Sequence, residues 1–333
     1  MIDYFAQQLA AAQTSKPRYF IAAFILLVLV TIPGIFLLVG NVEASLENVL
    51  PSSVESVATM NDARTQYAAD LLHVVFYTQG AVVDIREADD YMQEVSARLA
   101  SQENLLHVHE VQHSSNYELA VIDIQTDTGT DTDAISAAIN SINDALEASQ
   151  ASNPGVRAEI TGFAAIDQAT FSTIMSDFLV ITGVAMLLIV LVVFSLFRSV
   201  RYTLIPLASV MVALIATMGI TGYLDITITV VTMVAAAMIL GLGIDFGIHI
   251  IHSFNEYNKK LSTVNAMKKT VHELFRAQLG ASLTTSAGFL ALGLGVLPAM
   301  ANLGLVLAIG ILFTFLASTM LLPPILLLTE NTQ

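Results

Sequence analysis

The residue most suggestive of chemistry is Asp245, which lies in the middle of a long apolar segment. The fifteen residues before it, Val230 to Ile244, are uncharged, and so are the ten that follow it, up to Asn255. A carboxylate at the centre of a membrane-spanning helix costs about 2.5–3.5 kcal/mol on insertion scales. Because acidic residues are kept in membranes mainly where they transfer protons or bind ions, we expect Asp245 to carry protons.

Other residues share the helical face of Asp245. His249 and His252 follow it by four and seven residues, which places them on the same side of a helix. The glycines that remove side-chain bulk around it are Gly241, Gly243 and Gly247. They allow a second helix or water to come close. The two histidines either take part in proton transfer or simply lie near the helix end, where the helix dipole favours them.

Hydroxyl side chains fall at a similar depth in the next two apolar segments. At a rise of about 1.5 Å per residue, Asp245 lies roughly 14 Å from the inner end of its own segment. Candidates at that depth are Thr284, Thr285, Ser286, Thr314 and Ser318. From these we predict a proton relay made of Asp245, Thr284, Thr285, Ser318 and His249, with no metal, cofactor or catalytic residue.

The composition indicates a membrane protein with one acidic soluble part. Apolar residues make up 55% of the 333 residues and charged residues only 12%. Residues 41–175 hold 21 Asp and Glu but four Lys and Arg, a charge of 4 − 21 = −17, against −15 for the whole chain. Such an acidic part argues against nucleic acid as a partner. Cysteine is absent, so no disulfide is expected.

Six segments are long and apolar enough to cross a membrane. They are Tyr19–Gly40, Phe178–Phe197, Tyr202–Tyr223, Ile226–Ile251, Leu279–Ala299 and Leu303–Leu328. Lys and Arg next to these segments fall on one side, which predicts that both termini are cytoplasmic and that residues 41–175 lie outside. The first segment is too long for a signal peptide and is interpreted as a retained anchor.

The external part reads as alternating strands and helices. Strands are expected at Leu71–Thr78, Leu105–His113, Tyr117–Gln125 and Gly155–Thr161, and helices at Glu87–Ser101 and Thr132–Ser149. The order βαββαβ predicts an α+β ferredoxin-like fold. A further helix is expected near Ser53–Ala69.

These patterns give the following division: a cytoplasmic N-terminus (1–18), a first span (19–40), the external domain (41–175), spans 2 to 4 (176–254), a basic amphipathic helix on the inner membrane surface (255–278) and spans 5 and 6 (279–330).

The run Gly241-x-x-x-Asp245-Phe246 resembles the fourth-span signature of the resistance–nodulation–division (RND) superfamily, closest to its MmpL and hopanoid-exporter branch. Residues 197–207 and 281–292 agree with that resemblance, as does the order of one span, an external domain and five spans. The resemblance implies a transporter driven by the proton-motive force that exports hydrophobic or amphipathic molecules, lipids above all. It implies that Asp245 is the proton-relay carboxylate and residues 41–175 a porter-type domain.

Family members usually carry two such halves in one chain, whereas this sequence carries one. A homodimer would restore twelve spans and supply two copies of Asp245; a trimer and a heteromer are the alternatives. The resemblance also leaves open an accessory membrane subunit of Sec-type protein export and a lipid- or sterol-sensing module.

A match to the zinc-protease pattern HExxH lies at His109-Glu110-Val111-Gln112-His113. In zinc proteases the two histidines lie one helical turn apart. This segment has the pattern of a strand, where they would be roughly 13 Å apart. We therefore expect no zinc site. The sequence also lacks a P-loop, so no ATPase is expected.

Overall fold

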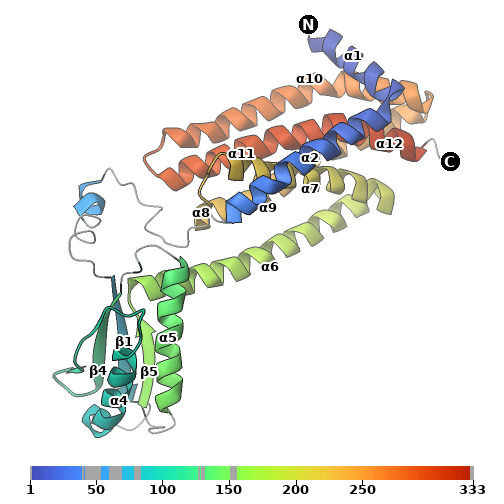
Figure 1. Cartoon of the computed structure of the whole chain (residues 1–333). Helices are drawn as coiled ribbons and strands as arrows, with labels where there is room; N and C mark the ends of the chain where they lie inside the picture. The colour runs from blue at the N-terminus through green and yellow to red at the C-terminus, as the bar shows by residue number, and fades with distance from the viewer. Residues whose placement is uncertain are drawn as a thin grey trace. The chain divides into compact units, whose positions relative to one another are not determined.

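The computed structural model describes residues 2–39, 41, 54–59, 70–78, 84–126, 128, 132–150 and 156–330. The chain divides into two compact units, one formed by residues 1–42 together with 176–333 and the other by residues 43–175. We call them the helical unit and the sheet unit. Helix α6 (Phe163–Phe197) begins in the sheet unit and ends in the helical unit (Figure 1).

The sheet unit contains an antiparallel sheet. Its strands are β1 (Asp70–Thr78), β2 (His107–Val108), β3 (Gln112–His113), β4 (Leu119–Thr126) and β5 (Val156–Thr161). Strand β1 lies between β4 and β5, and β2 and β3 both pair with β4. With helices α4 (Asp89–Ala100) and α5 (Thr132–Gln150) between the strands, this is the ferredoxin-like arrangement that the sequence predicts.

One face of this sheet carries the core of the unit. Alternate residues of β1, Leu72, Val74 and Phe76, are fully buried and belong to one cluster with the apolar faces of α4 and α5. The period of two in the strands and the helical spacing in α4 and α5 bury this face together. The predicted strand Leu105–His113 is two short strands, β2 and β3. Of the predicted helix Ser53–Ala69, only residues 54–59 are described, and residues 55–59 are helical.

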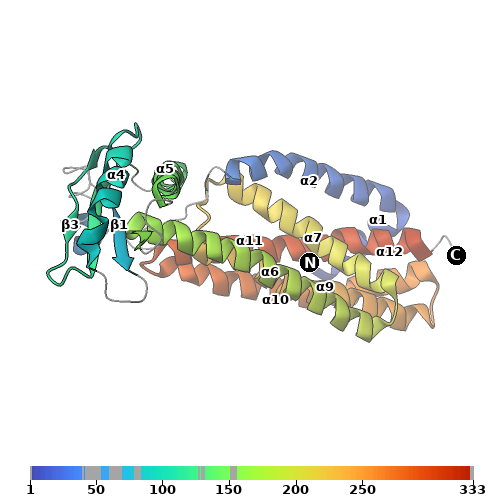
Figure 2. The same cartoon turned by 90° about the horizontal axis from the view of Figure 1, so that it is seen from below.

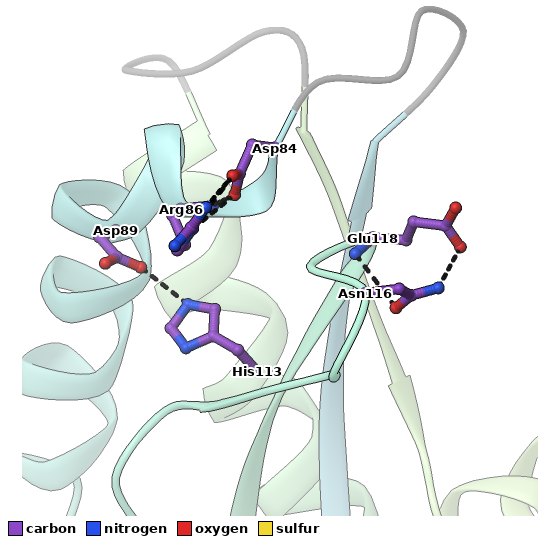
Figure 3. A network of polar contacts seen from close by, with 6 residues as sticks. All are labelled: Asp84, Arg86, Asp89, His113, Asn116 and Glu118. Carbon is purple, nitrogen blue, oxygen red and sulfur yellow. Dashed lines mark hydrogen bonds and ion pairs between the residues drawn. The ribbon is translucent and has the colours of Figure 1, made fainter.

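A polar network holds the hairpin between β3 and β4 against the start of α4 (Figure 3). Asp84 accepts hydrogen bonds from the side chain and backbone of Arg86, which holds the pKa of Asp84 down at about 2. The Arg86 guanidinium lies 3.8 Å from the centre of the Tyr117 ring. His113 contacts Asp89 at 2.9 Å. These contacts link a hairpin to a helix more than twenty positions away in the sequence.

The helical unit is a bundle. Its helices are α1 (Ile2–Ser15), α2 (Pro17–Val39), the second part of α6, α7 (Val200–Tyr223), α8 (Val230–Met233), α9 (Ala235–Asn258), α10 (Thr263–Leu290), α11 (Pro298–Leu316) and α12 (Leu322–Glu330). A 3₁₀ turn, η3 (Ala291–Leu294), follows α10, and a π-helical turn, η4 (Ala317–Leu321), joins α11 to α12. A capping box of Thr229 and Thr232 starts α8, and Pro298 starts α11.

Among the described residues, five helical segments are long and apolar enough to cross a membrane, one fewer than the sequence predicts. The difference lies in α10. The sequence predicts a surface helix at 255–278 and a separate span at Leu279–Ala299, but α10 is one helix whose first part is charged and whose second part is apolar. The apolar part ends at Leu290 and is too short alone to meet the length of a span.

Two further features of the helical unit were not predicted. The N-terminal residues form α1, whose buried Ala6, Leu9 and Ala10 pack into a cluster with Val271 and Phe275 of α10. Helices α2 and α7 lie side by side in both views (Figures 1 and 2) and approach so closely that their glycines meet backbone to backbone.

Candidate functional site

Helix α9 positions Asp245 through two close helix contacts. A Cβ added to Gly243 would lie 2.5 Å from a side-chain carbon of Thr314, so α11 packs directly on the α9 backbone there. A Cβ added to Gly247 would lie 2.7 Å from Pro206 of α7. These contacts fix one face of α9 and turn the opposite face, with Asp245, outward.

Asp245 is exposed on the surface of the chain and lines a cavity of about 420 Å³ between α9 and α10. The other lining residues are Leu242, Phe246, His249, Leu274, Ala277, Gln278, Ala281, Thr285 and Ile311. Within the described residues, the Asp245 carboxylate has no hydrogen bond or ion pair. The cavity therefore presents a carboxyl group, an imidazole and a hydroxyl, which are groups that can form hydrogen bonds with one another or with water.

The structure brings part of the predicted relay together. Asp245, His249 and Thr285 line the same cavity. Thr284 is exposed outside the cavity lining, and its hydroxyl donates to the Gly280 carbonyl of its own helix at 2.9 Å. Ser318 is fully buried in η4 and donates to the Thr314 carbonyl at 2.8 Å. Neither of these two hydroxyls reaches the cavity.

The glycines of α9 also divide into two kinds. Gly243 and Gly247 allow helix packing, as described above. A Cβ on Gly241 would meet no atom of the described residues within 4 Å, and the same holds for Gly280 and Gly288 of α10. Asp245 is likewise exposed, and we call these four exposed positions of α9 and α10 the open face.

Gln278 is a residue of the cavity that the sequence analysis did not select. Its side chain is 5% exposed, and its Nε2 donates to the backbone carbonyl of Phe246 at 2.9 Å. Residue 278 falls at the end of the predicted surface helix, where the sequence patterns do not single it out. The signal that could have found it is the spacing of Gln278, Ser282 and Ser286, which recur every four residues on the buried side of α10.

The HExxH segment does not form a helix. His113 belongs to β3 and contacts Asp89, while the His109 ring packs against His107 with centroids 4.7 Å apart. Among the described residues, no group of three or more His, Asp or Glu side chains is placed to hold a metal ion.

The sequence of this chain is similar to those of known membrane proteins. Residues 39–332 match the MMPL family. The chain belongs to this family, which is part of the RND superfamily. Its resemblance to that superfamily is thus confirmed, and it is a multi-pass membrane protein of a transporter family whose members are typically not enzymes.

Individual relatives agree. A membrane protein of Methanocaldococcus jannaschii is 34% identical over 222 residues, which are 66% of this chain and 56% of that protein. The toluene efflux pump membrane transporter TtgE and the solvent-resistant pump membrane transporter SrpB, both of Pseudomonas putida, are each 32% identical over 107 residues, 32% of this chain and 10% of each pump. The chain thus matches about half of the archaeal relative and a tenth of the pumps.

Proposed function

We propose that this MMPL protein exports hydrophobic or amphipathic molecules, lipids included, and that Asp245 couples export to proton entry. The observation that carries the proposal is the free Asp245 carboxylate in an apolar helix, lining a cavity with His249 and Thr285. Two relatives are named as a toluene efflux pump and a solvent-resistant pump. A proton that crosses 100 mV releases about 2.3 kcal/mol, and Asp245 would take up that proton.

For the arrangement in the membrane, we propose that both termini are cytoplasmic and that residues 41–175 form an extracytoplasmic, porter-like domain. The charged first part of α10 would lie at the inner surface. Its apolar part, with η3, would complete a sixth crossing before Pro298 starts α11. This placement keeps the Lys and Arg residues of α10 on the cytoplasmic side.

We further propose that the transporter works as a homodimer joined through the open face. An aspartate that faced lipid would carry the cost of a charge in hydrocarbon. Gly241, Gly280 and Gly288 leave room beside it for another helix. A two-fold axis beside this face would cover both copies of Asp245 at once.

The test uses the full chain in proteoliposomes that contain an apolar fluorescent dye, Nile red. An imposed proton gradient should drive dye transport by the unaltered chain and not by Asp245→Asn, because the amide cannot bind and release a proton. Nile red transport by Asp245→Asn at the rate of the unaltered chain would contradict the coupling role.

The matched control is Asp225→Asn. Asp225 lies in the same unit, accepts a hydrogen bond from Asn41 and lies outside the cavity lining. It has a backbone φ of 55°, a conformation that asparagine also adopts readily. Asp225→Asn should fold and transport dye like the unaltered chain. Equal loss in both variants would mean that the effect of Asp245→Asn is not specific to the cavity.

A further inference from the structure

Two glutamines of the helical unit are buried in the same way, and only one of them reaches the cavity. Gln278 on α10 is 5% exposed and Gln13 on α1 is fully buried. Each donates its Nε2 to a backbone carbonyl of a neighbouring helix, Gln278 to Phe246 at 2.9 Å and Gln13 to Thr319 at 2.8 Å. Gln278 lines the cavity with Asp245, whereas Gln13 does not.

The hydrogen bond of Gln278 fixes which atom faces the rest of the cavity. A backbone carbonyl can only accept a hydrogen bond, so the amide nitrogen must point at Phe246 and the amide oxygen must point away. That oxygen, Oε1, is buried without a hydrogen-bond partner in the described parts of the chain. A buried acceptor without a hydrogen-bond partner lowers the stability of the protein. A form of the site that places a hydrogen-bond donor next to Oε1 is therefore favoured.

We infer that Gln278 is a positioning residue that senses the protonation of Asp245, directly or through a water molecule. An ionised Asp245 is only an acceptor and has nothing to offer Oε1. A protonated Asp245 gains an O–H donor, which Oε1 can accept. The same side chain is bonded to Phe246, the residue next to Asp245, so the proton would strengthen the link between α9 and α10. This inference rests on the proposed function.

The groups facing the site from each neighbouring element are few. On α9 the titratable residues of the cavity are Asp245 and His249. On α10, Glu273 and Arg276 are exposed and outside the lining. Helix α11 carries no ionisable residue. Asp245 and His249 are therefore the ionisable side chains in the described lining of the cavity that Gln278 shares.

The experiment records acid-induced infrared difference spectra of the full chain in lipid vesicles and follows the carbonyl band of the protonated Asp245 carboxyl, identified by its absence in Asp245→Asn. In Gln278→Leu the band should move to higher frequency, because the carboxyl has lost a hydrogen bond. The pH at which the band is half-formed should fall by roughly half to one unit, because the protonated form is no longer favoured.

Gln13→Leu is the matched control. It removes the same kind of buried amide and the same kind of bond to a carbonyl, so it should lower thermal stability to a similar degree while leaving the Asp245 band and its midpoint unchanged.

An Asp245 band with unchanged frequency and midpoint in Gln278→Leu would overturn the role of Gln278 and leave the proposed function intact. A shift of the same size in Gln13→Leu would also overturn it, because a general loss of packing would then explain the effect. The absence of any Asp245 band in the unaltered chain would overturn both the proposed function and this inference.

Discussion

Two pairs of helices in the helical unit use glycine in opposite ways. In the α2–α7 pair, a Cβ on Gly219 would collide with the Thr31 carbonyl and one on Gly222 with the Gly34 carbonyl. On the open face of α9 and α10, Gly241, Gly280 and Gly288 would each accept a Cβ without meeting any atom within 4 Å. The first pair is closed by its glycines, whereas the second still has room for a partner.

We therefore expect the two helix pairs to have different roles. Backbone contact along α2 and α7 leaves little freedom for one helix to move against the other, so the pair is a fixed support. The α9–α10 pair holds the free carboxylate and the cavity and has an uncovered face. We expect proton-dependent movement there. Three predictions follow from this difference, and each compares a residue at a close helix contact with an exposed residue.

The largest effect is expected in the α2–α7 pair. Gly219→Ala should lower stability by about 1–3 kcal/mol or more, because the added carbon would force two backbones apart. Gly288→Ala on the open face is the matched substitution, and it should be neutral or stabilising, since alanine favours helix over glycine by up to about 1 kcal/mol. Thermal unfolding of the purified protein measures both. Equal destabilisation by the two substitutions would remove the distinction between a closed and an open pair.

The second prediction, with an effect of intermediate size, concerns contact between the open faces of two copies of the chain. The chain has no cysteine, so a single Gly280→Cys can report on contacts between copies. In membranes it should form a cross-linked dimer under mild oxidation, because α10 of one copy would face α10 of the other. Gly183→Cys on α6, where a side chain also meets nothing within 4 Å, is the control and should stay monomeric. Cross-linking at Gly183 but not at Gly280 would place the dimer elsewhere.

The smallest effect is the difference in stability expected between substitutions on the buried side and on the exposed side of α10. Ser286 is buried, and its hydroxyl donates to the Ala308 carbonyl of α11 at 3.1 Å. Ser286→Ala should cost roughly 0.5–1.5 kcal/mol of stability, about the net value of one hydrogen bond. Thr284→Ala should cost little, because within the described residues the Thr284 hydroxyl donates to carbonyls of its own helix alone. Chemical denaturation can compare the two. A larger loss for Thr284→Ala would mean that this threonine has a partner beyond its own helix.

Much of the fold follows from residue patterns alone. The β-rich segment Leu71–Thr78, the hairpin pattern of Leu105–His113 and Tyr117–Gln125, and the helical spacing in α4 and α5 predicted the sheet unit and the order of its elements along the chain. Long apolar segments gave most of the bundle. Helix α10 was predicted as two elements, because its charged and apolar parts have different compositions, although no proline separates them. Helix α1 was missed because its apolar residues become meaningful only against α10.

The site could be predicted only in part. Asp245 and His249 are recognisable because they share a helix, where spacing determines which residues are neighbours. Residues on other helices depend on rotation and depth, which spacing along one helix does not determine. Thr285 lines the cavity, while Thr284, one residue earlier, faces outward and Ser318 lies buried elsewhere. Gln278 needed the structure, because its role depends on the Phe246 carbonyl of a different helix.

The most direct test of the central claim measures protons and dye together in the same proteoliposomes. A pH-sensitive dye reports proton movement while Nile red reports export, for the unaltered chain and for Asp245→Asn. Our account predicts that adding Nile red speeds proton movement through the unaltered chain, and that Asp245→Asn abolishes both fluxes. Export of Nile red without proton movement, or proton movement that persists in Asp245→Asn, would contradict it.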